Sequence, residues 1–340
     1  MAKVVTFGEI MLRLAPNGYY RFFQSDQMQA TFGGGEANVA VSLANFGLQA
    51  AFVTKLPAHA IGQGAVDSLR ALGVDTSEIL RGGDRIGIYY LEKGASQRGS
   101  VCIYDRAGSA IQTVDPGEFD WDRIFAGADW FHFTGITPAL GPNLVQCCLD
   151  ACSAAKKHGV KISCDLNYRS KLWTREQAHA AMSELCQYVD LCISNEEDAK
   201  DVFGIQADSS DIRGGQLSRE GYRRVAERLM ERFSFEKVAI TLRSSHSASD
   251  NDWAAVLWDG KRFYVSRDYH LHIVDRVGGG DSFGGGLIYA LLTGMADQEA
   301  LEFAVAASAL KHSIEGDYNR VTISEVKKLA SGDGSGRVQR

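Results

Sequence analysis

Apolar residues along the chain alternate between short β-branched runs and longer stretches with helical spacing. Residues 3–8 form a short apolar run closed by a glycine, which is typical of a buried strand. Residues 36–47 instead carry apolar side chains at helical spacing and end at a glycine, which predicts a helix. The same alternation then predicts a strand at 50–56 and a helix at 65–74.

This alternation is interrupted twice before it resumes. Residues 12–32 and 86–115 have the pattern of short strands joined by turns, which indicates a small separate sheet. Further along we expect strands at 129–134, 160–165, 189–194 and 236–242, helices at 142–158, 175–188, 219–233, 281–294 and 297–314, and a hairpin at 253–266.

Repeated strand–helix units predict an α/β fold in which a mostly parallel sheet is covered by helices on both faces. The two strand-rich interruptions would form a second, discontinuous unit. The expected boundaries are 1–11, 33–85 and 116–330 for the α/β domain and 12–32 and 86–115 for the small sheet, with a polar loop at 206–218 and a disordered tail at 331–340.

Charge and hydropathy narrow the class of function. The formal net charge of −6 disfavours binding to a phosphate backbone, so nucleic acid is not an expected partner. The chain has no apolar run of about eighteen residues and its first residues lack the pattern of a secretory signal. We therefore expect a cytoplasmic protein that has no membrane partner.

The cysteines and histidines predict no metal centre. The seven cysteines include no C-x-x-C pair, and most lie in apolar runs, which favours buried and reduced thiols. The eight histidines are scattered along the chain, so we expect no metal site among them.

Glycine is distributed unusually. There are 36 glycines but only 5 prolines, and the glycines gather at 33–35, 278–280 and 284–286. A flexible linker would raise the content of both glycine and proline. Clustered glycines instead imply that the backbone comes very close to a ligand or to another part of the chain. Within residues 274–288, a strand-like apolar stretch leads into glycines and then into an apolar helical pattern.

This segment predicts an anion site. The N–H groups of Gly278, Gly279 and Gly280 would lie at a helix N-terminus, where the helix dipole also favours anions. Neither a Walker loop nor a G-x-G-x-x-G fingerprint is present. Asp281 would place a carboxylate beside a transferring phosphoryl group, where it could accept a hydroxyl proton. Alternatively, Asp281 only caps the helix.

Two segments together resemble the motifs of the ribokinase (PfkB) family of sugar kinases. Residues 275–281 (DRVGGGD) resemble the carboxy-terminal Asp-Thr-x-Gly-Ala-Gly-Asp motif, and residues 32–40 (FGGGEANVA) resemble the amino-terminal motif. The resemblance covers nearly the whole chain. It implies a ribokinase-like fold with a β-lid made from the two strand-rich segments, an anion hole at 278–280, and Asp281 as the catalytic base.

The resemblance also implies ligands and contacts. ATP and Mg²⁺ are the implied cofactors, and a monovalent-cation requirement stays open. The positions that match substrate contacts are Gly34, Gly35, Asn38, Tyr89, Tyr104, Arg106, Arg169 and Asp317. Those that match nucleotide contacts are Asn167, Arg169, Asn195, Thr241, Arg243, Ser244, Gly278 and Gly280, and those that match metal contacts, through water, are Glu197 and Asp198.

Three positions depart from the family pattern. Arg276 stands where Thr is usual, which puts one contact to nucleotide or phosphate in doubt, and Arg243 replaces a common Gly. Asp198 ends a motif that usually ends in Glu, although a shorter carboxylate can still hold water around Mg²⁺. The acidic residues here could equally form the ordinary first turn of a helix.

Arginines favour an acidic sugar. Arg13 stands where neutral-sugar kinases usually carry Asp, and Arg106 and Arg169 are further candidates for a basic pocket. A guanidinium matches a carboxylate bidentately, although each arginine alone could be a solvated residue. Within the family, the sequence resembles the kinases of 2-keto-3-deoxygluconate, which implies transfer of the γ-phosphate of ATP to the C6 hydroxyl of that sugar acid.

Other functions remain open. A kinase of fructose or another neutral sugar, a kinase of the epimer 2-keto-3-deoxygalactonate, and a non-catalytic sugar-acid sensor would share the fold. A nicotinamide oxidoreductase would share the strand–helix alternation but needs the missing fingerprint. Exposed edges of the lid strands predict a homodimer or higher homo-oligomer through the lid.

Overall fold

The computed structural model describes residues 1–195, 197–206, 219–334 and 336. Most of the predicted polar loop at 206–218, and part of the predicted disordered tail at 331–340, lie outside these residues. Among the helices of the described ranges, none is both long and apolar enough to cross a membrane.

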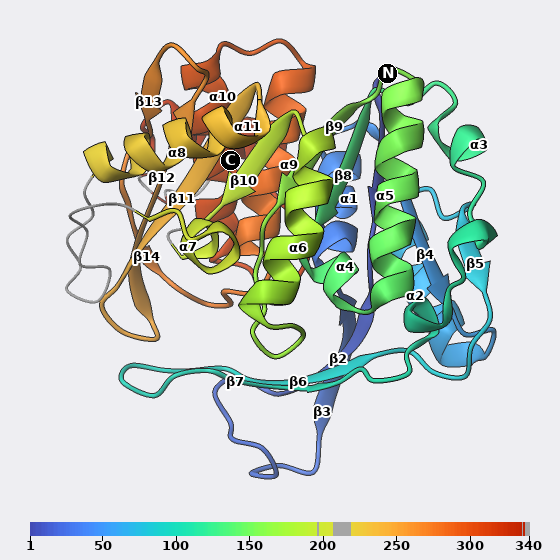
Figure 1. The fold of residues 1–340 in the computed structure, drawn as a ribbon. Helices are drawn as coiled ribbons and strands as arrows, with labels where there is room; N and C mark the ends of the chain where they lie inside the picture. The colour runs from blue at the N-terminus through green and yellow to red at the C-terminus, as the bar shows by residue number, and fades with distance from the viewer. Residues whose placement is uncertain (196, 207–218, 335, 337–340) are drawn as a thin grey trace.

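A ten-stranded sheet forms the centre of the molecule (Figure 1). Its strands are β1 (Lys3–Phe7), β4 (Gln49–Leu56), β5 (Ile79–Arg81), β8 (Trp130–Thr134), β9 (Lys161–Asp165), β10 (Leu191–Ser194), β11 (Lys237–Ser245), β12 (Asp250–Trp258), β13 (Phe263–Val265) and β14 (Tyr269–His272). They follow the order β13-β12-β11-β10-β9-β8-β1-β4-β5, with β14 paired to β12. Every pair from β11 to β5 is parallel, whereas β12, β13 and β14 pair antiparallel, so the predicted, mostly parallel α/β sheet is confirmed.

Helices cover both faces of this sheet, each over its own hydrophobic core. One face carries α1 (Gly35–Asn45), α2 (Ala60–Arg70), α9 (Gly279–Leu292), α10 (Asp297–Lys311) and α11 (Ile323–Ala330). The other carries α3 (Trp121–Phe125), α5 (Pro142–Lys157), α6 (Arg175–Leu185), α7 (Asp198–Phe203) and α8 (Arg219–Phe233), and the short α4 (Ile136–Ala139) follows β8. Figure 1 shows α5, α6 and α8 in front of the sheet and α1, α9 and α10 behind it.

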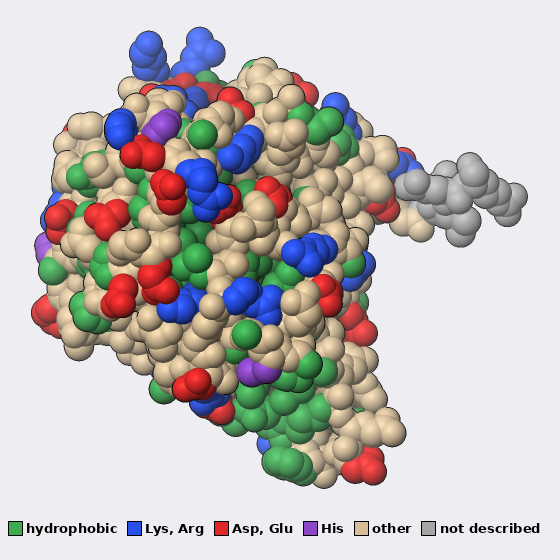
Figure 2. Space-filling model, turned by 90° about the vertical axis from the view of Figure 1, so that its right-hand side faces the viewer, with side chains coloured by type: hydrophobic (Ala, Val, Ile, Leu, Met, Phe, Trp, Pro, Cys, Tyr) green, Lys and Arg blue, Asp and Glu red, His purple; other side chains and the backbone are tan. Residues whose placement is uncertain are grey.

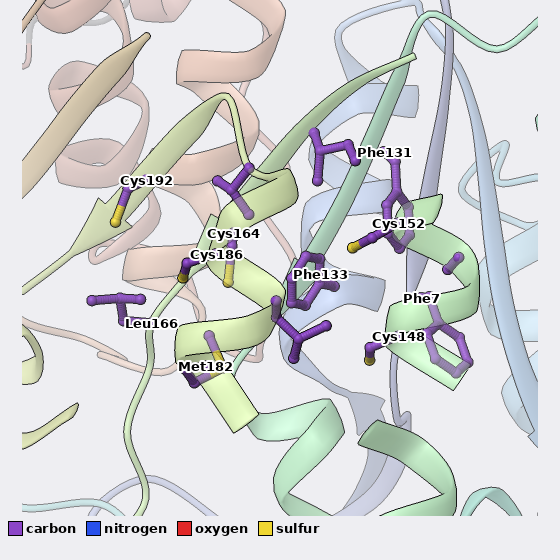
Figure 3. Packing of buried hydrophobic residues seen from close by; sticks show 14 of the residues in the cluster. Phe7, Phe131, Phe133, Cys148, Cys152, Cys164, Leu166, Met182, Cys186 and Cys192 are labelled. Carbon is purple, nitrogen blue, oxygen red and sulfur yellow. The ribbon is translucent and has the colours of Figure 1, made fainter. Parts of the chain in front are cut away.

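The core on the α5 face contains most of the cysteines (Figure 3). Six are buried there without a disulfide, and burial raises the pKa of every one of these thiols. The predicted role as small hydrophobic residues is therefore confirmed. They are Cys147, Cys148, Cys152, Cys164, Cys186 and Cys192.

A second sheet forms the lid. Its strands are β2 (Met11–Pro16), β3 (Met28–Gly33), β6 (Ile88–Glu92) and β7 (Val101–Asp105), in the order β3-β2-β6-β7. Each segment forms an antiparallel hairpin, and β2 and β6 join the two hairpins in parallel. Figure 1 shows the lid across the lower end of the central sheet, and Figure 2 shows hydrophobic side chains gathered at that end.

Some elements differ from the sequence pattern. Helix α2 begins at Ala60 rather than near residue 65, because the side chain of His59 caps it by accepting from the N–H groups of Ile61 and Gly62. The short elements β5, β14, α3, α4 and α11 were not predicted.

Candidate active site

The lid faces the carboxyl ends of the central strands across a cavity of about 410 Å³. Residues from both ends of the chain line it, because β1 and α1 lie beside β8 and α9 in the fold. The predicted site residues that it brings together are Gly34, Gly35, Asn38, Tyr89, Tyr104, Arg106, Asn167, Arg169, Asn195, Asp198, Thr241, Arg243, Gly278, Gly279, Gly280, Asp281 and Asp317.

Three predicted residues do not line this cavity: Ser244, Glu197 and Arg13, the last of which is described with its partners below. Ser244 follows Arg243 on β11, and successive residues of a strand face opposite sides, so only Arg243 faces the cavity. Glu197 lies at the start of α7 and lines an adjoining hollow with Arg169 and Asp198.

Helix α9 begins at the wall of the cavity with a tight glycine turn. Gly278 has φ 81°, a left-handed conformation that favours glycine. A β-carbon at this position would lie 2.0 Å from the carbonyl oxygen of Asp317, whereas the same side of Gly280 is open. The turn therefore requires Gly278, and Gly280 leaves room for a ligand.

The backbone donors at this end form a candidate anion site. Among the described residues, the N–H groups of Gly278, Gly280 and Asp281 have no hydrogen-bond partner. The N–H of Gly279 instead donates to the carbonyl oxygen of Arg276 over 3.3 Å and closes the turn. The set of unpaired donors therefore differs from the predicted one, because the N–H of Asp281 replaces that of Gly279.

Asp281 faces the first turns of α1. Nδ2 of Asn38 donates to Oδ2 of Asp281 over 2.7 Å. Burial raises the pKa of the Asp281 carboxyl to about 6, and the hydrogen bond from Asn38 opposes this rise. A carboxylate with this pKa is a stronger base than an ordinary aspartate and is still ionised at neutral pH.

A buried ionic network lies beneath the lid. Arg13 on β2 donates to Asp317 over 2.7 Å and to Asp275 over 2.5 Å, and the hydroxyl of Tyr89 donates to Asp317 over 2.6 Å. Arg13 is 4% exposed and does not line the cavity. The prediction that Arg13 belongs to a basic substrate pocket is therefore wrong, because its charge is already neutralised by two carboxylates.

Glu9 was not predicted, and it holds one of the predicted substrate arginines. It follows β1, is 4% exposed, and lines the cavity. Nε of Arg106 donates to Oε2 of Glu9 over 2.8 Å, and Oγ of Ser109 donates to Oε1 over 2.6 Å. The guanidinium of Arg106 also lies 5.3 Å from the ring centroid of Tyr104. The sequence signal that could have identified Glu9 is its position, because it is an acidic residue directly after the predicted first strand at 3–8.

Asp165 and Asp198 form a second acidic group in the cavity wall. Burial raises the pKa of Asp165 well above its usual range and that of Asp198 to about 6, and Arg169 opposes both shifts. Oδ1 of Asp198 accepts from the N–H of Tyr168, while its buried Oδ2 has no partner within the described ranges. An unpaired carboxylate oxygen beside a second carboxyl fits a hydrated Mg²⁺. Asp165 was not predicted.

Two guanidinium groups line the cavity near the start of α9. Burial and the neighbouring Arg243 both lower the pKa of Arg276, so the two cations lie close together. Nη2 of Arg276 donates to the carbonyl oxygen of Ala248 over 3.1 Å. Both residues depart from the family pattern, and together they add positive charge to the anion site.

Comparisons with known proteins identify the class. The sequence profile of the pfkB family of carbohydrate kinases matches residues 1–322 of this chain. A crystal structure of a 2-dehydro-3-deoxygluconokinase from Thermotoga maritima is 51% identical, with a TM-score of 0.94 over 97% of this chain and 98% of that chain. The 2-dehydro-3-deoxygalactonokinase of Haloferax volcanii is 32% identical over 98% of both chains. A putative ribokinase II from E. coli, solved with ATP and Mg²⁺, shares the fold at 19% identity, with a TM-score of 0.82 over 97% and 99% of the two chains.

The mostly parallel sheet with its flanking helices and the small separate sheet form a ribokinase-like fold. The chain belongs to the pfkB family of carbohydrate kinases. It is a sugar kinase, and the comparisons include kinases of two epimeric sugar acids.

Proposed function

We propose that the protein transfers the γ-phosphate of ATP to the C6 hydroxyl of 2-keto-3-deoxygluconate and so forms 2-keto-3-deoxy-6-phosphogluconate in the cytoplasm. The observation that carries the proposal is the position of Asp281, a carboxylate with a raised pKa at a helix N-terminus that has unpaired N–H groups. The 51% identity to the Thermotoga maritima gluconokinase supports this choice of sugar.

The sugar acid would lie between the lid and Asp281. Arg106 is already paired with Glu9, so the carboxylate of the substrate would share or replace that partner. Arg169 lines the same cavity and makes no ion pair with a carboxylate in the part of the chain that the structure describes, which leaves a second guanidinium for an anion. A neutral sugar would use neither charge.

The triphosphate would lie along the opposite wall. Arg243 and Arg276 supply positive charge there, and the start of α9 supplies N–H donors. Asp165 and Asp198 would hold hydrated Mg²⁺, which when bound neutralises negative charge on the phosphate oxygens.

The residues of this chain then need only position groups and move one proton. Asp281 accepts the proton of the C6 hydroxyl, and Asn38 holds the carboxylate in one orientation while it does so. The N–H groups of Gly280 and Asp281 stabilise the charge of the phosphoryl group in transfer. The lid carries Tyr89 and Tyr104 over the sugar and limits access of water.

The test is a coupled assay of ADP release with a panel of sugars. We expect kcat/KM on 2-keto-3-deoxygluconate to exceed that on 2-keto-3-deoxygalactonate, fructose and ribose. The galactonate epimer is the second candidate, because the Haloferax volcanii relative carries that name. A preference for fructose or ribose would contradict the proposal, and binding of the acid without ADP release would identify a sensor.

A further inference from the structure

Three side chains outside the cavity form a group of donors suited to a metal ion. His246 lies in the turn between β11 and β12, Asp252 on β12 and His270 on β14, and one ligand atom of each lies within 4.8 Å of the others. Nε2 of His246 is 2.6 Å from Oδ2 of Asp252, and Nδ1 of His270 is 2.8 Å from Oδ1 of the same carboxylate. One carboxylate therefore stands between two imidazole nitrogens.

Strand pairing builds this group and keeps it apart from the active site. Asp252 lies directly opposite His270 in the antiparallel register of β12 and β14. The next residue on β12, Trp253, lines the cavity, and successive side chains of a strand face opposite sides. Asp252 therefore faces away from the cavity, and neither histidine lines it.

The donor set selects the kind of ion. Two imidazoles and one carboxylate suit Zn²⁺, Co²⁺ or Ni²⁺, whereas Mg²⁺ prefers oxygen ligands alone. Metal–donor distances of about 2.1 Å in a tetrahedral site place donors about 3.4 Å apart. The present separations of 2.6 and 2.8 Å would therefore open by less than about 1 Å, which these exposed side chains allow. Hydrogen bonds from His270 and His246 also hold the pKa of Asp252 below its usual range, so the carboxylate is ionised.

We propose that His246, Asp252 and His270 bind one borderline divalent cation of the Zn²⁺ class, at a site separate from that of Mg²⁺. Water would complete the coordination. The histidines are scattered along the sequence and predict no metal site there, because only the pairing of β12 with β14 brings these residues together.

A bound ion would fix the turn that touches the lid. Within this turn, the N–H of Ala248 donates to the carbonyl oxygen of Ser96 over 2.7 Å, and Oγ of Ser249 accepts from the N–H of Ser96 over 2.9 Å. Ser96 lies in the loop between β6 and β7. The ion would tie this contact point to β14 and so add stability to the folded chain.

The experiment titrates Zn²⁺ into the untagged, chelator-treated, full-length protein in excess Mg²⁺, which occupies the oxygen-only sites. Calorimetry should show one Zn²⁺ site per chain, and Zn²⁺ should raise the Tm. Loss of a group that only hydrogen-bonds to a metal ligand lowers metal affinity about 10–100-fold. Loss of a ligand itself should cost more, so His246→Ala and His270→Ala should each weaken Zn²⁺ binding by a larger factor. Both side chains are exposed, and circular dichroism checks that the variants fold.

The matched control is His272→Ala. His272 lies two residues further along β14, is equally exposed, and pairs with Asp250 over 2.8 Å, but it is not part of the group. Its loss should leave Zn²⁺ affinity and the Tm shift unchanged. The proposal would be overturned if the wild type did not bind Zn²⁺, if His270→Ala bound Zn²⁺ as tightly as the wild type, or if His270→Ala and His272→Ala lost equal affinity. Each of these results would mean that the three side chains form only ordinary exposed ion pairs.

Discussion

Nδ2 of Asn38 lies 2.7 Å from Oδ2 of Asp281, although 243 residues separate them along the chain. The two side chains meet because the helices that carry them start at the same cavity and pack closely. A β-carbon at Gly285 on α9 would lie 2.7 Å from Cβ of Ser42 on α1, so small residues permit this approach. The amide therefore holds the proposed base at the anion site.

Removing this hydrogen bond should change the pH profile. The pKa of Asp281 is raised to about 6, so protonation below that pH removes the base and kcat/KM should fall as pH decreases through 6. The amide of Asn38 favours the ionised form, so Asn38→Ala should move the midpoint of this acidic limb to higher pH. Profiles of kcat/KM for the two proteins measure the shift. An unchanged midpoint would assign the limb to another group, such as Asp198.

Replacing the base itself should abolish most turnover. Asp281→Asn keeps the shape of the side chain but cannot accept a proton, so kcat should fall by about 10²–10⁴-fold. Single-turnover ADP release measures the step, and circular dichroism should show an unchanged fold. Near-normal turnover in this variant would mean that Asp281 only caps α9.

The pair of Arg106 and Glu9 should control affinity for the acid. Arg106→Met removes a charged hydrogen-bond donor, so KM for the sugar acid should rise about 10–100-fold while KM for ATP stays unchanged. Steady-state kinetics with each substrate varied in turn distinguish the two constants. Equal increases in both KM values would indicate a general distortion of the cavity instead.

Glu36 should make stability depend on pH. It is 1% exposed, and burial raises the pKa of its carboxyl from 4.5 to about 7, although hydrogen bonds from Thr137 and Thr134 oppose the rise. Between these two values the folded state binds more protons than the unfolded state, so the free energy of unfolding should fall as pH rises, by about 3 kcal/mol for this group. Urea unfolding across this range should show the slope, and Glu36→Gln should make it less steep by the contribution of Glu36, because Asp165, Asp198 and Asp281 also have raised pKa values. An identical slope in the variant would contradict this assignment.

The apolar face of the lid should mediate self-association. Tyr20 is 48% exposed, Phe23 88% and Ile103 on the edge strand β7 50%, at the end of the molecule where Figure 2 shows hydrophobic side chains. We therefore expect a homodimer, and Ile103→Lys should weaken it. Light scattering over a range of concentrations measures the mass. A wild-type monomer at micromolar concentration would contradict the prediction.

The sequence predicted those parts of the site whose geometry is local. The glycine turn at Gly278 and the carboxylate of Asp281 lie within four residues, and a helix start fixes how they face each other. Most of the parallel sheet was likewise predicted, because each strand–helix unit carries its own hydrophobic period.

Side chains whose partners lie far along the chain could not be assigned. Arg13 has the sequence context of a pocket residue, yet Asp275 and Asp317, 262 and 304 residues away, neutralise it. Glu9 gains its role from Arg106, 97 residues away, and Asp165 from the pairing of β9 with β10. These contacts follow from packing of the folded chain, and no local spacing encodes them.

The lid sheet has a mechanical consequence for how the enzyme opens. Both excursions that build it leave the central domain and return to it, and β2 and β6 join them edge to edge. The strand register places all four connections to the central domain at one end of this plate and both turns at the other, so the plate is held along one end and can tilt about it. Entry and exit of ligands would then depend on small tilts of a rigid body, and stiffening any one tether should slow turnover without altering the chemistry.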